Sequence, residues 1–407
     1  MSPVLGSPGG DARRVDYAGV AVGVFVVGMH RSGTSAVAAA LEALGLDVGA
    51  PDQQMAADAA NPAGYYELRE ICDLNDEILS SAGGRWDCPP HLPEGWELEP
   101  EMTPYFRRAA SVVGTRLAKS RWLIKDPRIT LLLPLWRRAV LDRCAVILIV
   151  RDPMEVAWSL ALRNGMPLLT GLALWSDYNR RALGGLSGLP VHVCAYDELV
   201  SDPLTTMTSI GASLESWNEL PERADVEVAA ARVRPELRRN TWPRDNSDAL
   251  EVPGEIERFE KFLADLAGAH GVFEPGRPPS SPWEDALLSE RRAGVVRFRI
   301  AEAQTEVAIQ ERDEAVRARE SLGHQLHARN VEFDAVSETA RSDKARLGGD
   351  LEAVRARLAV VDDNLSEAQT RRRDAEKALR STTRRLQALE GRFPIRVARA
   401  IKRLRRS

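Results

Sequence analysis

One strand, loop and helix unit near the N-terminus restricts the fold of this chain more than any other segment. The apolar run Val20–Val27 predicts a buried strand, and Ala36–Leu46 is a helix pattern rich in alanine and leucine. Between them lies Gly28–Ser35, in which two glycines are separated by four residues. Such a loop points successive backbone N–H groups and a helix N-terminus at one place, so it predicts an anion-binding site.

Apolar runs and helical segments alternate through the next part of the chain. The runs are typical of strands buried on both faces, and the segments between them have helical spacing. The expected strands are Trp122–Ile124, Ala145–Val150 and Val191–Ala195, and the expected helices are Leu131–Arg143 and Leu172–Leu183. The sequence therefore predicts an α/β fold, a P-loop-like three-layer sandwich with a central parallel sheet. Asn61–Pro104 is expected to add a helix and loops over the active edge of that sheet.

A proline-rich break divides the chain. Proline is frequent from Glu274 to Trp283 and then absent until Pro394, while Ala, Glu, Arg, Leu and Asp become common. The predicted parts are a disordered leader over 1–19, the α/β domain over 20–273, a linker over 274–286, a coiled coil over 287–390 and a basic amphipathic tail over 391–407.

The segment after the break has the 3-4 apolar alternation of a coiled coil. One position holds Leu347, Val354, Val361, Ala368, Ala375 and Leu389, and the other holds Leu351, Leu358, Leu365, Leu379 and Leu386, with Arg372 and Thr382 as flaws. If it were one helix from Leu287 to Leu389, it would be about 150 Å long. One helix cannot cover its own stripe, so a homo-oligomer is expected; a monomeric or partly disordered charged helix is the alternative.

Charge and cysteine content indicate a cytoplasmic protein. The formal net charge of −4 conceals a basic stretch, Arg392–Arg406, that has no acidic residue. The four cysteines form no C-x-x-C pair, which suggests buried thiols in a reducing compartment. Val20–Val27 is too short for a membrane helix. In the tail, Val397, Ile401 and Leu404 share one face among arginines, so we expect peripheral contact with an anionic inner membrane face, or else a solvated end of the coiled coil. No nucleic-acid partner is expected.

The residue types in the loop Gly28–Ser35 indicate which kind of anionic ligand it binds. A Walker A loop has lysine after its second glycine, whereas this chain has Thr34, and its cation is Arg31 inside the loop. The loop is similar to the 5'-phosphosulfate loop of the sulfotransferase family, with Arg31 where many members have lysine. The resemblance implies that the donor 3'-phosphoadenylyl sulfate is bound by His30, Arg31, Ser32, Gly33, Thr34 and Ser35, with no metal.

A second motif follows the strand Ala145–Val150. Arg151 ends the strand, and Asp152 and Pro153 are a favourable start for a helix on which Ser159 lies. This pattern is similar to the family's 3'-phosphate site, where an arginine and a serine eight residues later bind that phosphate. Helix capping alone is the simpler explanation of Arg151–Pro153.

Sulfuryl transfer needs positive charge at the leaving oxygen and a base for the acceptor proton. Arg31 and Lys125 are the expected catalytic cations; Lys125 resembles a family lysine that contacts the transferred group, or it pairs with a carboxylate. Glu67 is the expected base and Glu70 the substitute, while His30 and His91 are weaker choices. Trp86 either stacks on a sugar or packs internally.

The acceptor class is suggested by resemblance alone. Asn61–Glu67 resembles the N-P-x-G-Y-x-E segment of bacterial members with carbohydrate-type acceptors, so a carbohydrate or glycolipid is expected. The glycine-rich adenine motif of animal members is not evident, and Arg238–Asn240 is a partial replacement or an exposed turn. The alternatives to a sulfotransferase are a P-loop kinase or NTPase and an inactive coiled-coil scaffold.

Overall fold

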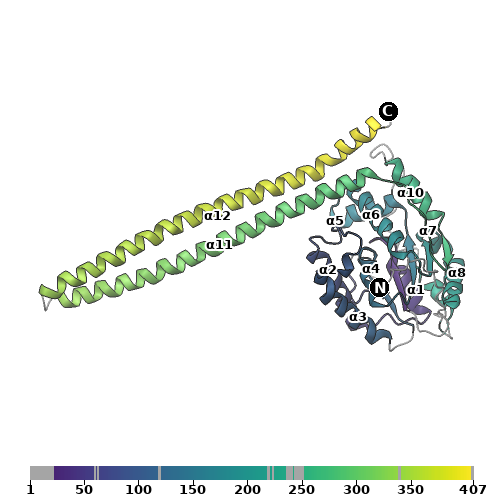
Figure 1. Cartoon of the computed structure of the whole chain (residues 1–407), viewed down its shortest axis with the longest axis horizontal. Coiled ribbons are helices and arrows are strands. Elements are labelled where there is room, and N and C mark those ends of the chain that lie inside the picture. Colours follow the sequence, from purple (N-terminus) through teal and green to yellow (C-terminus); the bar gives the residue numbers. More distant parts are fainter. Residues whose placement is uncertain are drawn as a thin grey trace, which may run out of the picture. The chain divides into compact units, whose positions relative to one another are not determined.

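The computed structural model describes residues 23–58, 61, 64–117, 121–217, 221, 224–234, 242, 252–337 and 341–404. The predicted leader over 1–19 and Arg238–Asn240 lie outside the described residues. The chain divides into two compact units, Met1–Leu288 and Ser289–Ser407. The first contains the sheet and its helices, and the second consists of two long helices (Figure 1).

The sheet of the first unit has the strand order β2-β1-β3-β4-β5. Its strands are β1 (Gly23–Val27), β2 (Leu123–Lys125), β3 (Cys144–Val150), β4 (Val191–Ala195) and β5 (Gly268–His270). The first four are parallel and coincide with the four predicted runs, so the α/β prediction is confirmed. The sheet is parallel except at one edge, where β5 pairs antiparallel with β4. β5 is a three-residue Gly-Ala-His strand that is not fully buried, so its sequence carries no apolar signal.

Helices cover both faces of the sheet and make three layers. On one face Val24, Val26 and Ile147 pack into a core with α1, α7, α8 and α9. On the other face the ring of Phe25 contacts Trp136 of α4. The helices are α1 (Thr34–Ala43), α2 (Arg69–Ser81), α3 (Thr103–Leu117), α4 (Ile129–Ala139), α5 (Pro153–Asn164), α6 (Leu168–Leu186), α7 (Tyr196–Ser201), α8 (Pro203–Ser216), α9 (Val226–Arg232) and α10 (Gly254–Ala264), with short 3-10 turns η1 (Pro51–Gln53), η2 (Trp96–Leu98) and η3 (Pro100–Met102).

The strand order places a binding crevice at the carboxyl ends of the strands. β1 lies between β2 and β3, so the chain leaves β1 toward one side of the sheet and later returns on the other. In open α/β sheets, ligands bind at this reversal point, beyond the carboxyl ends of the strands. The segments that follow β1, β2, β3 and β4 therefore meet at one edge, although they are far apart in sequence.

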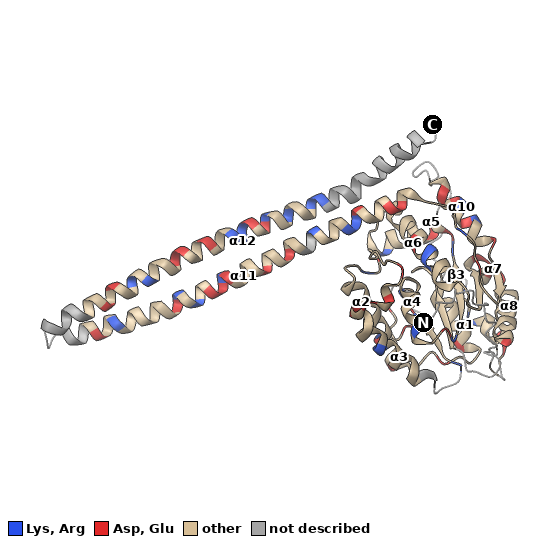
Figure 2. Ribbon diagram, in the orientation of Figure 1, with Lys and Arg blue, Asp and Glu red and all other residues tan. Residues whose placement is uncertain are grey.

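The second unit is a pair of helices and not one long helix. α11 (Pro282–Ser337) and α12 (Arg341–Leu404) lie side by side in Figure 1. They run antiparallel, because Arg371 reaches Glu311 at 3.2 Å and Arg319 reaches Asp362 at 2.7 Å. The condition for one helix of about 150 Å, continuity from Leu287 to Leu389, is therefore not met. Figure 2 shows both charge types along both helices.

The face that α12 turns toward α11 is the apolar stripe found in the sequence. Leu351, Leu365 and Ala368 are buried there, and the rest of the stripe with described side chains is partly buried: Leu347, Val354, Leu358, Val361, Arg372, Ala375, Leu379 and Thr382. α11 contributes small and polar residues, including Ala301, Thr305 and Ala308. The stripe is thus covered within one chain, so an uncovered apolar stripe no longer argues for self-association. The homo-oligomer and the coiled coil stay predictions.

All four cysteines are buried and none is disulfide-bonded. Among the described residues, no helix has the length and apolar character needed to cross a membrane.

His192 in β4 predicts how the stability of the fold depends on pH. Its side chain is buried, Nδ1 lies 2.8 Å from the Ser213 hydroxyl, and burial lowers its pKa to about 4. The folded state thus binds fewer protons than the unfolded state, so the stabilisation from neutral His192 is present above pH 6.5 and is lost as the pH falls toward 4. This shift corresponds to about 3 kcal/mol at most.

We expect His192→Gln, which can still contact Ser213, to flatten the acid side of the stability curve. Urea unfolding between pH 4 and pH 8 measures this. Parallel curves for the wild type and the variant would contradict the assignment.

Candidate functional site

The loop after β1 is held in one conformation by its surroundings. The hydroxyl of Thr130 on α4 accepts from Gly28 N at 2.9 Å and donates to Gly28 O at 3.1 Å. Gly28 and Gly33 have positive φ angles of 149° and 98°, which favour glycine. A Cβ on Gly28 would lie 2.5 Å from the carbonyl oxygen of Ile149, and one on Gly33 would lie 2.3 Å from the ring of Tyr196. Gly33 caps α1, so the N-terminus of α1 starts at this loop.

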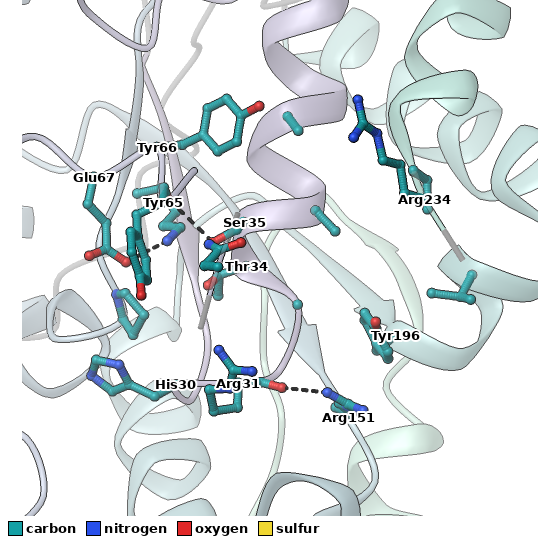
Figure 3. A pocket seen from close by; sticks show the side chains of 18 of the residues that line it. His30, Arg31, Thr34, Ser35, Tyr65, Tyr66, Glu67, Arg151, Tyr196 and Arg234 are labelled. Atoms are coloured by element: carbon teal, nitrogen blue, oxygen red, sulfur yellow. Dashed lines mark hydrogen bonds and ion pairs between the residues drawn. The ribbon is translucent and has the colours of Figure 1, made fainter. Parts of the chain in front are cut away.

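The two motifs predicted from the sequence meet in this loop. Arg31 Nε donates to Ser159 Oγ at 2.8 Å, across 128 residues of sequence. The guanidinium of Arg151 donates to the carbonyl oxygen of Arg31 at 2.9 Å, a bond drawn in Figure 3. Arg31 has a φ of 70°, and this left-handed conformation turns its carbonyl toward Arg151. The predicted cation of the first motif is therefore bonded to both predicted residues of the second.

Arg151 is fixed by contacts on every side. Its guanidinium pairs with Glu155 at 2.8 Å and lies over the Tyr196 ring at 4.5 Å. Its carbonyl oxygen accepts from Trp175 Nε1 at 2.9 Å. Asp152 caps α5 by accepting from Glu155 N at 2.8 Å, as the sequence predicts. Arg151 therefore has a fixed orientation at the end of β3, where it pairs with Glu155 and also lines the cavity.

A cavity of about 340 Å³ lies over this junction. The predicted residues His30, Arg31, Gly33, Thr34, Ser35, Glu67, Lys125 and Arg151 line it. Two predicted residues do not: Ser159 is fully buried behind Arg31, and Ser32 is 1% exposed. Among the residues that the structure describes, Ser32 Oγ has no hydrogen-bond partner. Ser159 thus acts on the cavity through the side chain of Arg31.

Glu67 and Lys125 form a buried ion pair in the cavity wall. Lys125 Nζ lies 2.5 Å from Glu67 Oε1, and its side chain is 1% exposed. Lys125 ends β2, and Glu67 precedes α2, so the sheet fixes one partner and the start of a helix the other. The thiol of Cys72 lies 3.7 Å from Glu67 Oε2. Glu70, the substitute base, is exposed and does not line the cavity.

The acidic groups behind this pair are already neutralised by the chain's own cations. Glu67, Cys72 and Asp126 have potential ligand atoms close together. Burial raises the pKa of the Cys72 thiol, which is therefore protonated and a poor metal ligand. Asp126 is paired with Arg128 at 3.1 Å, and Glu67 with Lys125. This arrangement resembles a charge-balanced support for the cavity wall and not a metal centre.

His30 is a neutral part of the wall. Burial, followed by the charge of Arg128, moves the pKa of His30 well below its usual value. Its ring packs against those of Trp86 at 4.6 Å and Tyr178 at 5.9 Å. Trp86 therefore has an internal packing contact. His91 is exposed and does not line the cavity.

Three arginines that the sequence analysis did not single out also line the cavity. They are Arg163 on α5, Arg232 at the end of α9 and Arg234 beyond it. Arg163 follows Ser159 by one helical turn, so helix periodicity could have found it. Arg232 and Arg234 belong to no motif, and only the packing of α9 against α1 brings them here.

The cavity is strongly positive. Its lining holds six Lys and Arg side chains against one carboxylate, that of Glu67. Burial, the charge of Arg163 and the charge of Arg151 together lower the pKa of Arg31. A ligand with several negative charges would relieve this repulsion, so the site is suited to a polyanion.

A comparison with known protein families agrees with this chemistry. A family model described as the sulfotransferase family matches residues 23–219, which include all the predicted site residues. No curated protein matches this chain. The sulfotransferase domain from the Synechococcus PCC 7002 olefin synthase is similar at 19% identity, covering 56% of this chain and 95% of that domain, with a TM-score of 0.29. The sulfotransferase domain from the curacin biosynthetic pathway is similar at 14% identity, covering 67% and 98%, with a TM-score of 0.29.

Proposed function

We propose that this chain, which a model of the sulfotransferase family matches over residues 23–219, transfers a sulfuryl group from 3'-phosphoadenylyl sulfate to a hydroxyl of a carbohydrate or glycolipid. The observation that carries the donor assignment is the bonded junction of Arg31, Ser159 and Arg151. This junction gives one cavity two anion-binding sites, and a donor with phosphates at both ends requires two such sites. Thr34, where a Walker A loop has lysine, argues against the kinase or NTPase alternative.

The residues present fit such a donor. The loop offers backbone N–H groups and the N-terminus of α1 to one phosphate. Arg151 forms the second site, beside the Arg31 side chain that Ser159 holds in place. The unpartnered hydroxyl of Ser32 is a spare hydrogen-bonding group in the same loop. Arg31 and Arg151, which both line the cavity, supply positive charge for these two phosphates.

The chain's residues divide the chemistry between them. A bond forms from the acceptor oxygen to sulfur while the bond from sulfur to the bridging oxygen of the donor breaks, so negative charge builds on that oxygen. Arg31 and Lys125 supply positive charge for it. Glu67 takes the proton that leaves the acceptor hydroxyl. The 2.5 Å contact of Lys125 holds the Glu67 carboxylate in place.

The segment that resembles carbohydrate-type members is part of the same cavity. Asn61, Tyr65, Tyr66 and Glu67 line it. Asn61 Nδ2 donates to Ser35 Oγ at 3.2 Å, which links this segment to the donor loop. An acceptor bound by the segment would therefore lie beside the proposed donor site. This adjacency supports a hydroxylated acceptor with polar contacts.

The second unit suggests where the enzyme acts. Residues 371–407 hold fourteen Lys and Arg against three Asp and Glu, whereas the whole chain has a net charge of −4. Lys377, Arg380, Arg384 and Arg385 of α12 line one shallow groove, and Figure 2 shows the basic residues of this part of α12. A cation near an anionic membrane surface contributes about 1 kcal/mol. We therefore retain contact with an anionic inner membrane face, from the cytoplasmic side, as part of the proposal.

Donor binding is tested with the product nucleotide 3'-phosphoadenosine 5'-phosphate. We expect calorimetry to show that it binds the full chain more tightly than ATP or AMP. Arg151→Ala should weaken it by about 10- to 100-fold, because a charge-assisted contact is lost. Arg107→Ala, at an exposed arginine of α3 outside the cavity, is the control. Tighter binding of ATP would favour the kinase alternative and refute the donor assignment.

The role of Glu67 is tested by turnover of donor labelled with radioactive sulfur, with polysaccharide and glycolipid acceptors. Glu67→Gln is expected to lower kcat at least 100-fold while nucleotide affinity is kept, because a general base contributes about 10²- to 10⁴-fold. An inactive wild type across acceptors would support the scaffold alternative. Full activity in Glu67→Gln would mean that another group takes the proton.

A further inference from the structure

Arg163 is a cation of the cavity that no carboxylate balances. It lies near the C-terminus of α5, one turn beyond Ser159, and lines the cavity. Its side chain is exposed, and the part of the chain that the structure describes places no acidic group in an ion pair with it. Arg151, by contrast, is paired with Glu155. The charge of Arg163 is therefore available to a ligand.

Arg163 lines the same cavity as Tyr65, Glu67 and Lys125. Burial raises the pKa of Tyr65, whose hydroxyl donates to Asp58, and the charge of Arg163 opposes this rise. Arg163 also adds to the lowering of the pKa of His30, whose main cause is burial. Tyr65, His30, Glu67 and Lys125 are neighbours in the cavity wall. An acceptor hydroxyl beside Glu67 would therefore share the cavity with Arg163.

Arg232 and Arg234 are the other two exposed arginines of the cavity lining. Burial raises the pKa of Tyr66, and the charges of Arg232 and Arg234 oppose that rise. In Figure 3, Arg234 and Tyr196 lie on one side of the loop and Glu67 and His30 on the other. Arg234 is thus separated from Glu67 by the loop.

The two ends of the proposed donor already have their cations, in Arg31 and Arg151. Arg163 and Arg151 both lower the pKa of Arg31, so three positive charges act on one another here. A third anionic group, supplied by the second substrate, would balance Arg163. We propose that the acceptor carries a carboxylate, phosphate or sulfate beside its reacting hydroxyl and that Arg163 binds this group; the inference rests on the proposed sulfotransferase function.

A guanidinium is suited to this task. It presents paired N–H donors that match two oxygens of a carboxylate or phosphate, and it stays charged at neutral pH. An acceptor held at its anionic group would bring its hydroxyl toward Glu67. A neutral acceptor of the same size would lack this contact and bind more weakly. Arg163 is thus proposed as a specificity residue.

The test uses the full chain saturated with 3'-phosphoadenosine 5'-phosphate, so that added anions cannot enter the donor site. Glucose, glucuronate and glucose 6-phosphate are titrated as probes and followed by NMR. At least one charged sugar is expected to bind about ten-fold more tightly than glucose, as one charge-assisted contact would give. The two charged probes separate a carboxylate preference from a phosphate preference.

Arg163→Gln is expected to abolish the preference for charged sugars and to leave nucleotide affinity unchanged. Arg163→Lys should keep part of the preference, and Arg277→Gln, at an exposed arginine outside the cavity, should keep all of it. Equal binding of charged and neutral sugars to the wild type would overturn the inference, as would weaker nucleotide binding in Arg163→Gln. Failure of the nucleotide to bind the wild type would instead refute the proposed function.

Discussion

The hydrogen bonds that join Arg31 to Ser159 and to Arg151 hold the site of this enzyme together. The three residues lie in different segments of the chain: Arg31 is in the loop after β1, Arg151 follows β3, and Ser159 lies on the helix after β3. They meet because β1 and β3 are neighbours in the sheet, in register from Gly23 and Cys144. The parallel pairing of two buried strands is therefore the physical cause of the site.

Positive charge is the second property of the site, and it has a cost in the free protein. Guanidinium groups around one cavity repel one another, as the lowered pKa of Arg31 indicates. The protein compensates in part through Glu155, beside Arg151, and Glu67, beside Lys125. The remaining charge lines the cavity and favours binding of anions, because opposite charge there lowers the free energy of the bound state.

Local patterns predicted the parts of this architecture that depend on short stretches of sequence. The four parallel strands and the loop Gly28–Ser35 carry apolar runs and glycines that leave few alternatives. The antiparallel strand β5 escaped prediction because Gly-Ala-His has no apolar pattern. The two-helix form of the second unit was not predicted. A 3-4 apolar stripe has the same sequence pattern whether a second copy of the chain or another helix of the same chain covers it.

Within the site, sequence spacing predicted residues that belong to motifs and missed those that packing brings in. Arg232 and Arg234 reach the cavity only because α9 packs on α1. Lys125 pairs with Glu67 across 58 residues of sequence. The sequence suggested a carboxylate partner for Lys125 but could not identify it, because the pairing depends on where α2 begins relative to the end of β2. Tertiary packing, not local propensity, decides such contacts.

The central claim is that the loop around Arg31 and the pair Arg151 and Ser159 bind one molecule. A crystal structure of the full chain with 3'-phosphoadenosine 5'-phosphate tests it most directly. We expect the 5'-phosphate at the loop N–H groups and the 3'-phosphate within hydrogen-bond distance of Arg151, beside the Arg31 side chain that Ser159 holds. A nucleotide with either phosphate bound elsewhere would contradict the account.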